Sequence, residues 1–250
     1  MRLLTVIPAR IGSSRLPGKP LRTIGGQPLV SIVAQRALGL ALTERVVVAA
    51  DSRSVLDAVA HLDVDRILTS RQHRSGTERI AEVMGRQEYT DIDAVLDFQV
   101  DQPFLPDKAA RGALRMVRSG FSIGTAAAQL DPNQLSNRNV VKVWVDNETG
   151  HAKRFSRVAQ AGAELASCIV LHHLGVYAYT RQAVLQWVAL PECIEEQSER
   201  LEQLRPMTNG MPIGVATLDG KAPLAIDTQT DLEQAQSRRI KIRDQSRKSA

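Results

Sequence analysis

The sequence has few of the features that mark several large classes of protein. Aromatic residues make up only 4% of the 250 residues, and the two cysteines, Cys168 and Cys193, stand alone. Two isolated thiols form no disulfide framework and are typical of a reducing cytoplasm. No apolar run approaches the ~20 residues of a membrane span, and Pro8 and Arg10 cut short the apolar start of the chain. We therefore expect a cytoplasmic protein without a signal peptide or membrane insertion.

Most of the chain also lacks an excess of positive or negative charge. The formal net charge is +5, but the last 14 residues contain six basic residues and one acidic residue, which account for the whole excess. Residues 1–236 contain 26 basic and 26 acidic residues. Binding of nucleic acid usually needs a basic surface with stacking aromatic side chains. We expect no nucleic-acid partner, and we interpret residues 244–250 as a disordered basic tail.

The chain does contain a regular alternation of strand-like and helix-like segments in its first half. Short apolar runs predict buried strands at 3–7, 46–50, 66–68 and 94–98. Amphipathic stretches between them predict helices at 29–42, 54–61, 77–85 and 107–117. This alternation is typical of an α/β fold with a doubly wound, Rossmann-like, mostly parallel sheet.

The second half is more mixed. It predicts strands at 139–146, 173–179 and 213–218, and helices at 195–204 and 228–243. Thr228 and Asp231 have the spacing of a capping box at the start of the last helix. We expect a single α/β domain over 1–243 with a smaller inserted subregion.

One loop concentrates the residues expected of a phosphate-binding site. Residues 8–20 follow the first predicted strand directly, and ligands of open α/β sheets bind beyond the carboxyl ends of the strands. The loop, PARIGSSRLPGKP, contains two glycines, two serines and three cations. A triphosphate requires such backbone donors and positive charge. The spacing is neither the dinucleotide fingerprint nor a P-loop, and a solvated basic loop is the alternative interpretation.

Further segments, taken in order with this loop, resemble one enzyme family. They are Ser75-Gly76-Thr77-Glu78-Arg79, Gln99-Val100-Asp101-Gln102-Pro103, Val140-Val141-Lys142-Val143, His173-Leu174-Gly175-Val176-Tyr177, Leu201-Glu202-Gln203-Leu204-Arg205, and Asp227-Thr228 with Asp231-Leu232-Glu233. Together they resemble the motifs of the CMP-sugar synthetases, and most closely those of the 3-deoxy-manno-octulosonate (KDO) cytidylyltransferase family. The resemblance covers nearly the whole chain except its tail, and the chain is identified as a divergent member.

The resemblance implies a cytidylyltransferase that activates a 3-deoxy ulosonic sugar acid, KDO or a close relative. Such an enzyme joins a sugar hydroxyl to the α-phosphate of CTP by in-line attack and releases pyrophosphate. The implied cofactor is Mg²⁺, which prefers one or two carboxylates together with phosphate oxygens and water. The implied assembly is a homodimer. The resemblance also implies a nucleotide half at about 1–130 and a smaller inserted subregion for sugar binding and dimerisation at about 131–212.

The same resemblance assigns roles to individual residues. The implied catalytic residues are Lys19, Asp101 and Asp227, and the two aspartates are the implied metal ligands. CTP would contact a set of residues in the nucleotide half: Pro8, Ala9, Arg10, Ser13, Arg15, Lys19, Ser75, Gly76, Thr77, Arg79 and Gln99. The sugar acid would contact Gln99, Arg157, His173, Tyr177, Glu202 and Gln203.

Without the family, some of these residues have ordinary structural explanations. Asp101 could be a turn residue before Pro103, and Asp227 could cap the last helix. Arg15 could simply pair with an acid. A lone histidine beside a strand, such as His173, is more often part of a core.

The sugar half departs from the family pattern more than the nucleotide half does. The family's Gly-Asp-Glu reads Val100-Asp101-Gln102, which adds bulk and removes a carboxylate near the implied metal. Residues 158–162 replace the Pro-Trp-Asp-Arg segment that normally follows Phe-Ser-Arg, and His172 stands where an arginine often occurs. We therefore expect a changed or relaxed preference for the sugar acid.

Two other classes of function remain open. A nucleotide-sugar-dependent glycosyltransferase often uses an Asp-x-Asp metal motif, and residues 63–65 and 91–93 have that pattern. Both precede their predicted strands, so we expect them at the end of the sheet away from the ligand. The other alternative is a catalytically impaired nucleotide-binding homologue, which the changes at Gln102 and after Arg157 would explain.

Overall fold

A computed structural model of the chain describes residues 1–159 and 165–237. The chain forms two compact units whose segments alternate along the sequence. The loop unit contains Leu4–Val83, Phe98–Leu105 and the described part of Pro223–Ala250, and it carries residues 8–20. The β10 unit contains Met1–Leu3, Met84–Asp97 and Pro106–Ala222.

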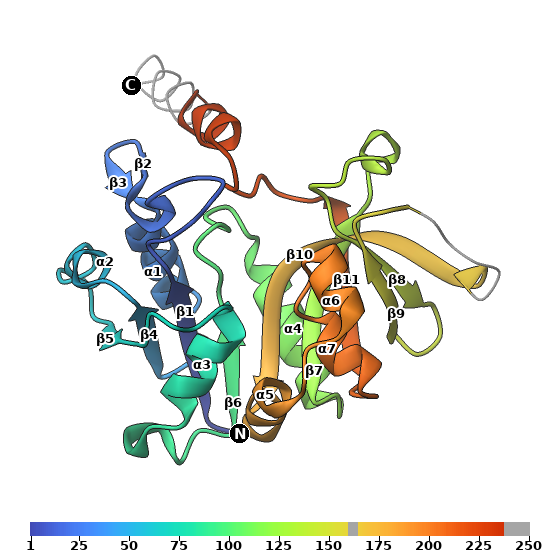
Figure 1. The fold of residues 1–250 in the computed structure, drawn as a ribbon, viewed down its shortest axis with the longest axis horizontal. Helices are drawn as coiled ribbons and strands as arrows, with labels where there is room; N and C mark the ends of the chain where they lie inside the picture. Colours follow the sequence, from blue (N-terminus) through green and yellow to red (C-terminus); the bar gives the residue numbers. More distant parts are fainter. Residues whose placement is uncertain (160–164, 238–250) are drawn as a thin grey trace. The chain divides into compact units, whose positions relative to one another are not determined.

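Three parallel strands form the sheet of the loop unit. β1 (Leu3–Ala9) pairs with β4 (Arg45–Ala50), which in turn pairs with β5 (Asp65–Leu68). The helices between and after them are α1 (Leu29–Gly39), α2 (Arg53–Asp57) and α3 (Gly76–Met84) (Figure 1). β1 is buried along its whole length, as expected of a continuous apolar run in a parallel sheet. The carboxyl ends of all three strands therefore lie at one edge, where the loop after β1 begins.

The loop unit also contains short elements near the loop and a helix at its C-terminal end. The short elements are η1 (Lys19–Leu21), β2 (Thr23–Ile24) and β3 (Gln27–Pro28). Residues 229–237 are helical, and the predicted capping box at their start is confirmed. The Thr228 N–H donates to Asp231 Oδ2 at 2.8 Å, and the Asp231 N–H donates to Thr228 Oγ1 at 3.3 Å. The rest of the predicted helix and the basic tail lie outside the described residues.

β10 (Cys168–Thr180) pairs with three other strands of its unit. It pairs antiparallel with β7 (Ile123–Gln129), while its first half pairs with β8 (Lys142–Asp146) and its second half with β6 (Ala94–Asp97). The change of partner accompanies an irregularity between His173 and Tyr177, where Gly175 has a φ of 68°. β9 (Ala152–Ser156) pairs with β8, and β11 (Ile213–Lys221) lies parallel to β7.

Small residues let α4 (Asp107–Arg118) pack closely on β7 and β11. A Cβ atom on Gly124 of β7 would lie 2.1 Å from the carbonyl oxygen of Ala113, and one on Gly112 would lie 2.8 Å from Ala216 Cβ. Glycine and alanine have a low strand preference, yet residues 123–129 form a buried strand. Packing under α4 explains why this strand was not predicted from its sequence.

The other helices of the β10 unit surround this sheet or connect its strands. They are η2 (Gln87–Tyr89), η3 (Pro132–Gln134), α5 (Arg181–Ala189), α6 (Ile194–Glu199) and α7 (Leu204–Thr208). The prediction of one continuous helix over 195–204 is wrong. Arg200, with a φ of 54°, ends α6 before α7 begins.

The α/β fold class is confirmed, although β10 makes the sheet of its unit mixed rather than parallel. Every strand predicted from an apolar run is present, with ends that shift by up to five residues. β7, β9 and α5 were not predicted. The division into nucleotide and sugar halves at about residue 130 stays a prediction about substrates.

Candidate active site

The loop after β1 closes on itself around Ile11. The Ile11 carbonyl accepts hydrogen bonds from the N–H groups of Ser13, at 3.0 Å, and Gly18, at 3.2 Å. Gly18 has a φ of 68°, a left-handed conformation that favours glycine. The chain therefore turns sharply at Gly18 and begins η1 with Lys19, at the strand-end edge of the loop unit.

Lys19 lies between the two aspartates that the sequence singled out. Its Nζ donates to Asp227 Oδ1 at 2.8 Å and to Asp101 Oδ2 at 3.1 Å. Arg15 Nη2 also reaches Asp227 Oδ1, at 3.0 Å. The Lys19 side chain is only 13% exposed, while Asp101 and Asp227 are 27% and 28% exposed. The structure thus brings together all three predicted catalytic residues, which are separated by up to 208 positions in the sequence.

Backbone contacts hold the two aspartates in place. The Ile226 N–H donates to the Asp101 carbonyl at 2.8 Å, which ties the segment before Asp227 to the segment after β6. The cap of the last helix is made by Thr228 and Asp231, whereas the Asp227 carboxylate is turned towards Lys19. The capping explanation therefore applies to its neighbour Thr228 rather than to the Asp227 side chain.

The charges in this cluster perturb one another. Burial lowers the pKa of the Lys19 ammonium, but the negative charges of Asp101 and Asp227 outweigh this effect and its pKa lies above the ordinary value. Burial raises the pKa of the Asp101 carboxyl; Lys19 opposes this rise and the Asp227 charge adds to it. A second cation brought to these carboxylates would relieve the repulsion between them.

The donor set of this cluster fits a magnesium ion. Two carboxylates already converge on one cationic group, and Mg²⁺ is commonly held by one or two carboxylates with phosphate oxygens and water. Within residues 1–159 and 165–237, no group of three or more His, Cys, Asp or Glu side chains could hold a metal. Phosphate and water would therefore have to complete the coordination.

The segment before α3 lies beside the loop, as the predicted nucleotide site requires. Ser75 caps the helix, because its Oγ accepts from the Glu78 N–H at 3.1 Å. A Cβ atom on Gly76 would lie 3.3 Å from both Gln99 Nε2 and Pro8 Cγ. The Oγ1 atom of Thr77 is buried and has no partner in the part of the chain that the structure describes. Gly76 thus allows three predicted nucleotide-contact segments to meet closely.

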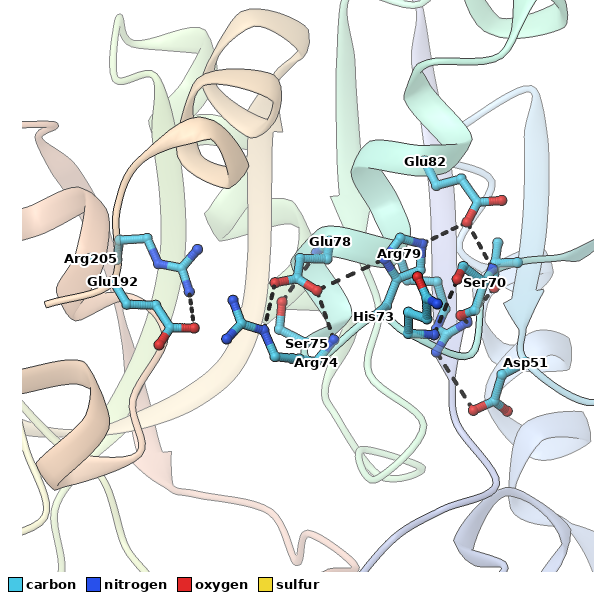
Figure 2. A network of polar contacts seen from close by, with 12 residues as sticks. Asp51, Ser70, His73, Arg74, Ser75, Glu78, Arg79, Glu82, Glu192 and Arg205 are labelled. Carbon is cyan, nitrogen blue, oxygen red and sulfur yellow. Dashed lines mark hydrogen bonds and ion pairs between the residues drawn. The ribbon is translucent and has the colours of Figure 1, made fainter.

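Arg79, another predicted nucleotide contact, is directed along the strand ends. It is 2% exposed, and its Nη1 donates to Thr69 Oγ1 and, at 3.1 Å, to the Ser70 carbonyl. Its Nη2 lies 3.7 Å from Asp51 Oδ2 (Figure 2). Burial lowers the pKa of Arg79, whereas the charge of Asp51 raises it. Asp51 was not among the predicted site residues, although an acid directly after a buried strand could have been recognised.

Two of the predicted sugar residues, His173 and Tyr177, lie in an aromatic cluster of the β10 unit. The ring of His173 lies 5.2 Å from Tyr177 and 5.1 Å from Phe155, measured between centroids. His173 Nε2 lies 2.9 Å from Thr125 Oγ1, and that hydroxyl donates to the Val176 carbonyl at 2.6 Å. A hydroxyl has one proton to donate, so Nε2 must carry the proton in this contact.

Burial controls the ionisation of this cluster. It lowers the pKa of His173 to about 3, with a further contribution from His172. It also raises the pKa of Tyr177 well above its ordinary value, and the Glu202 charge adds to that rise. Tyr177 and Glu202 therefore lie within electrostatic reach of each other, as the predicted sugar site would need.

Arg157 is held from several sides. Its backbone N–H donates to Glu199 Oε2 at 3.0 Å, and its side chain donates to the carbonyls of Glu199 and Arg138. The Arg157 carbonyl accepts from Lys142 Nζ at 3.0 Å. Gln203, the last predicted sugar residue, precedes α7 and is 4% exposed.

Two residues that contact Arg157, Glu199 and Lys142, were not among the predicted site residues. Glu199 accepts from both Ser156 and Arg157, and Lys142 is completely buried. A lysine inside an otherwise apolar strand was the available signal for Lys142, whereas the partner of Glu199 is distant in sequence.

The two Asp-x-Asp segments are occupied by structural contacts. Arg45 Nε donates to Asp65 Oδ2 at 2.9 Å, at the amino-terminal ends of β4 and β5. Arg2 pairs with Asp91, and its N–H donates to Asp93 Oδ2 at 2.7 Å. Asp65 therefore lies at the end of the loop-unit sheet away from residues 8–20, as expected.

Similarity to known proteins agrees with this arrangement. A cytidylyltransferase family model matches residues 4–213. A 3-deoxy-manno-octulosonate cytidylyltransferase from Gemmatimonas aurantiaca is 43% identical over 242 residues, covering 94% of this chain and 93% of that protein. One from Methylococcus capsulatus is 40% identical over 243 residues, covering 92% of this chain and 94% of the relative.

Solved structures agree as well. One described as CMP:2-keto-3-deoxy-manno-octonic acid synthetase complexed with CTP has a TM-score of 0.85 and 33% identity, covering 96% of this chain and 99% of the other. A 4-diphosphocytidyl-2C-methyl-D-erythritol synthase from Anaerococcus prevotii has a TM-score of 0.62 at 12% identity, over 94% and 97% of the two chains, which shows a shared fold.

The fold, the strand-end loop and the matched family model define a nucleotidyltransferase of the cytidylyltransferase class. Within that class, the chain belongs to the 3-deoxy-manno-octulosonate cytidylyltransferase family. The predicted family is thereby confirmed, and with it the prediction of an enzyme.

Proposed function

We propose that the chain transfers the cytidylyl group of CTP to a hydroxyl of KDO or a closely related ulosonic acid. The observation that carries this proposal is the contact of Lys19 with both Asp101 and Asp227 at the edge where the phosphate-type loop begins. A loop with backbone donors and three cations can bind a triphosphate, and two adjacent carboxylates can bind its metal.

In the proposed reaction, the sugar hydroxyl oxygen forms a bond to the α-phosphorus of CTP. The bond from that phosphorus to the bridging oxygen of the β-phosphate breaks, pyrophosphate leaves with the bonding electrons, and the hydroxyl proton is released. Positioning and charge neutralisation are the main contributions that a protein makes to phosphoryl-type transfer. Arg10 and Lys19 would hold the phosphates and oppose the charge that develops on the leaving pyrophosphate, while Arg15, which pairs with Asp227, is the weaker candidate.

Asp101 and Asp227 are the residues that would hold Mg²⁺. The ion would supply positive charge that neutralises the phosphate oxygens. When nucleotide binds, the ammonium of Lys19 would exchange part of its contact with the carboxylates for contact with phosphate. This role requires Lys19 to stay protonated, which its raised pKa supports.

The remaining substrate contacts belong to this proposal as well. Pro8, Ala9, Arg10, Ser13 and Gln99 would contribute to CTP binding. The sugar acid would be bound by residues of the β10 unit: Arg157, His173, Tyr177, Glu202 and Gln203. The departures at Gln102, His172 and residues 158–162 support a preference that differs from, or is broader than, that of the relatives.

We also propose a homodimer in the cytoplasm. The family resemblance supports the dimer, and the location is supported by the thiols of Cys168 and Cys193, which are both free. No helix among the described residues is long and apolar enough to cross a membrane.

Calorimetric titration and turnover together test the proposed function. The protein should bind CTP in the presence of Mg²⁺ and release pyrophosphate only when a suitable ulosonic acid is added. CTP binding without turnover across a panel of such acids would favour an impaired homologue. A preference for a sugar nucleotide over CTP would favour a glycosyltransferase and overturn the proposal.

Lys19→Ala offers a specific check on the phosphate-loop assignment. Loss of a charge-assisted contact of about 1.5–3 kcal/mol should weaken CTP binding by roughly 10- to 100-fold. Isothermal titration with CTP and Mg²⁺ measures the change. An unchanged CTP affinity would remove Lys19 from the triphosphate site.

A further inference from the structure

A continuous set of polar contacts joins the carboxyl ends of all three strands of the loop unit to α3. It begins at Arg79 of α3, which contacts Thr69 and Ser70 after β5. Thr69 continues to the end of β4, because its backbone N–H and its hydroxyl both donate to the Ala50 carbonyl, at 2.9 and 3.1 Å. The next residue, Asp51, pairs with Arg79 at 3.7 Å.

Asp51 also fixes the phosphate-type loop. Its Oδ1 accepts a hydrogen bond of 2.9 Å from the N–H of Ile11. Ile11 is the residue on whose carbonyl the loop closes, through Ser13 and Gly18. One oxygen of the Asp51 carboxylate thus binds the backbone N–H of Ile11, around which the loop closes. The other oxygen pairs with the guanidinium of Arg79 in α3. Both charged partners are largely buried, with Asp51 9% and Arg79 2% exposed.

This pair connects two segments that are both predicted to contact CTP. Residues 8–20 carry the cations for the triphosphate, and Ser75, Gly76 and Thr77 begin the helix that contains Arg79. A buried Asp–Arg pair with several further hydrogen bonds fixes geometry more firmly than an exposed pair does. The distance between the two binding segments therefore depends on Asp51 and Arg79.

We propose that Asp51 and Arg79 are positioning residues that set the loop conformation competent to bind CTP. They act through Ile11 and the start of α3 rather than by touching the reacting atoms. The proposal rests on the proposed cytidylyltransferase function, and it adds an acid outside the residues implied by the family motifs. Arg79 therefore shapes the nucleotide site indirectly, through its contacts with Asp51, Thr69 and Ser70.

The test compares Asp51→Ala with Asp51→Asn and with a matched control, Asp65→Ala. Asp65 forms an Asp–Arg pair in the same unit, but at the opposite strand ends and with partial exposure. Asp51→Ala should raise the KM for CTP by roughly 10- to 100-fold, the effect of losing one charged hydrogen bond. The KM for the sugar acid should change little. Asp51→Asn retains an acceptor for Ile11 and should restore much of the CTP affinity.

Hydrogen exchange of a peptide covering residues 10–19 provides a readout that does not need turnover. Exchange should be faster in Asp51→Ala and unchanged in Asp65→Ala. If Asp51→Ala does not fold, Asp51→Asn decides the question, because loss of the ion pair alone should still raise the KM for CTP several-fold. If the wild type showed no CTP-dependent turnover, the proposed function would fail, and the exchange comparison alone would decide the positioning role.

Three results would overturn the proposal. The first is a folded Asp51→Ala variant with unchanged KM for CTP and unchanged exchange over residues 10–19. The second is an equal rise in the KM for both substrates together with a lower melting temperature, which indicates a general structural role. The third is an Asn variant that behaves like the Ala variant in every measurement, because the hydrogen-bond acceptor would then be irrelevant.

Discussion

Asp101 is the residue on which the proposed chemistry depends most directly. Asp101→Asn keeps the size of the side chain but removes the charge that would hold the metal. Loss of several kcal/mol of charge stabilisation should lower kcat by at least about 100-fold. The melting temperature should not fall, because burial already disfavours the ionised carboxyl, as its raised pKa shows. Turnover measured over a range of Mg²⁺ concentrations checks this, and activity within threefold of the wild type would exclude Asp101 from the site.

His173 gives a prediction about pH at the same scale. Its pKa is about 3 in the folded chain, against an ordinary value of 6.5, mainly because burial disfavours the charged ring. Between these two values the unfolded chain binds a proton that the folded chain does not. The stability contributed by neutral His173 is therefore fully present above pH 6.5 and is lost progressively as the pH falls towards 3.

Urea unfolding at pH 7.5 and pH 5 measures this contribution. The wild type should lose roughly 2 kcal/mol more unfolding free energy over that interval than His173→Gln, which cannot titrate. His61→Gln is the matched control, since His61 is exposed. Equal losses in the wild type and in His173→Gln would show that the folded chain protonates His173 normally.

Single residues differ in how well the sequence predicted them. Lys19, Asp101 and Asp227 were selected from loop composition, strand ends and family motifs, and the structure brings them into contact. Asp51 follows an equally clear strand, but its partner Arg79 is 28 positions away and no local pattern joins them. Long-range pairs of this kind depend on how elements pack, which local composition does not specify.

At the scale of elements, Gly76 allows α3 to approach its neighbours closely, because it has no side chain. Gly76→Ala would place a methyl group 3.3 Å from Gln99 Nε2 and from Pro8 Cγ. Alanine is favoured inside helices by about 0.5–1 kcal/mol, so the melting temperature should change little. The KM for CTP should rise by roughly 10-fold, because a small displacement of binding groups is costly.

Gly39→Ala is the control for this prediction. Gly39 ends α1, and nothing lies within 4 Å of a Cβ built there. Kinetics with CTP and thermal melting of both variants separate helix preference from crowding. If Gly76→Ala kept the wild-type KM for CTP, the segments around Gly76 would not form the nucleotide site.

Elements were predicted well where their apolar pattern was strong and poorly where packing decided. The β1 and β4 runs are continuous and rich in β-branched residues, and each forms a strand. β7 is composed mainly of small residues and forms because α4 packs directly on it. The charged pattern over 195–204 suggested one helix, but the positive φ of Arg200 divides it into two.

At the scale of the whole molecule, net charge does not indicate function. The excess of +5 belongs to the last 14 residues, while residues 1–236 are balanced and contain the cations of the proposed site. Deleting residues 244–250 should therefore leave kcat and the KM for CTP within about twofold of the wild type, since none of the predicted site residues lies among them. Steady-state kinetics of the shortened chain measures this. A large loss of kcat would assign the tail a catalytic role.

The overall fold class and the family could be predicted from sequence, but the division into two interleaved units could not. Residues 98–105 and 223–237 belong to the same unit as residues 4–83. Hydrophobic periodicity reports the type of each element, not which distant segments pack together. The prediction that Asp227 lies in the same site as Lys19 therefore depended on the family motifs rather than on hydrophobic periodicity.

The most direct test of the central claim is the identity of the products formed from CTP, Mg²⁺ and KDO. Phosphorus NMR of the reaction mixture distinguishes CTP, CMP, a CMP-sugar phosphodiester and pyrophosphate. We predict that CTP is converted into equal amounts of a CMP-sugar and pyrophosphate, and that neither forms with Asp101→Asn on the same timescale. Unchanged CTP with KDO and with every related ulosonic acid, or free CMP in place of a CMP-sugar, would contradict the account.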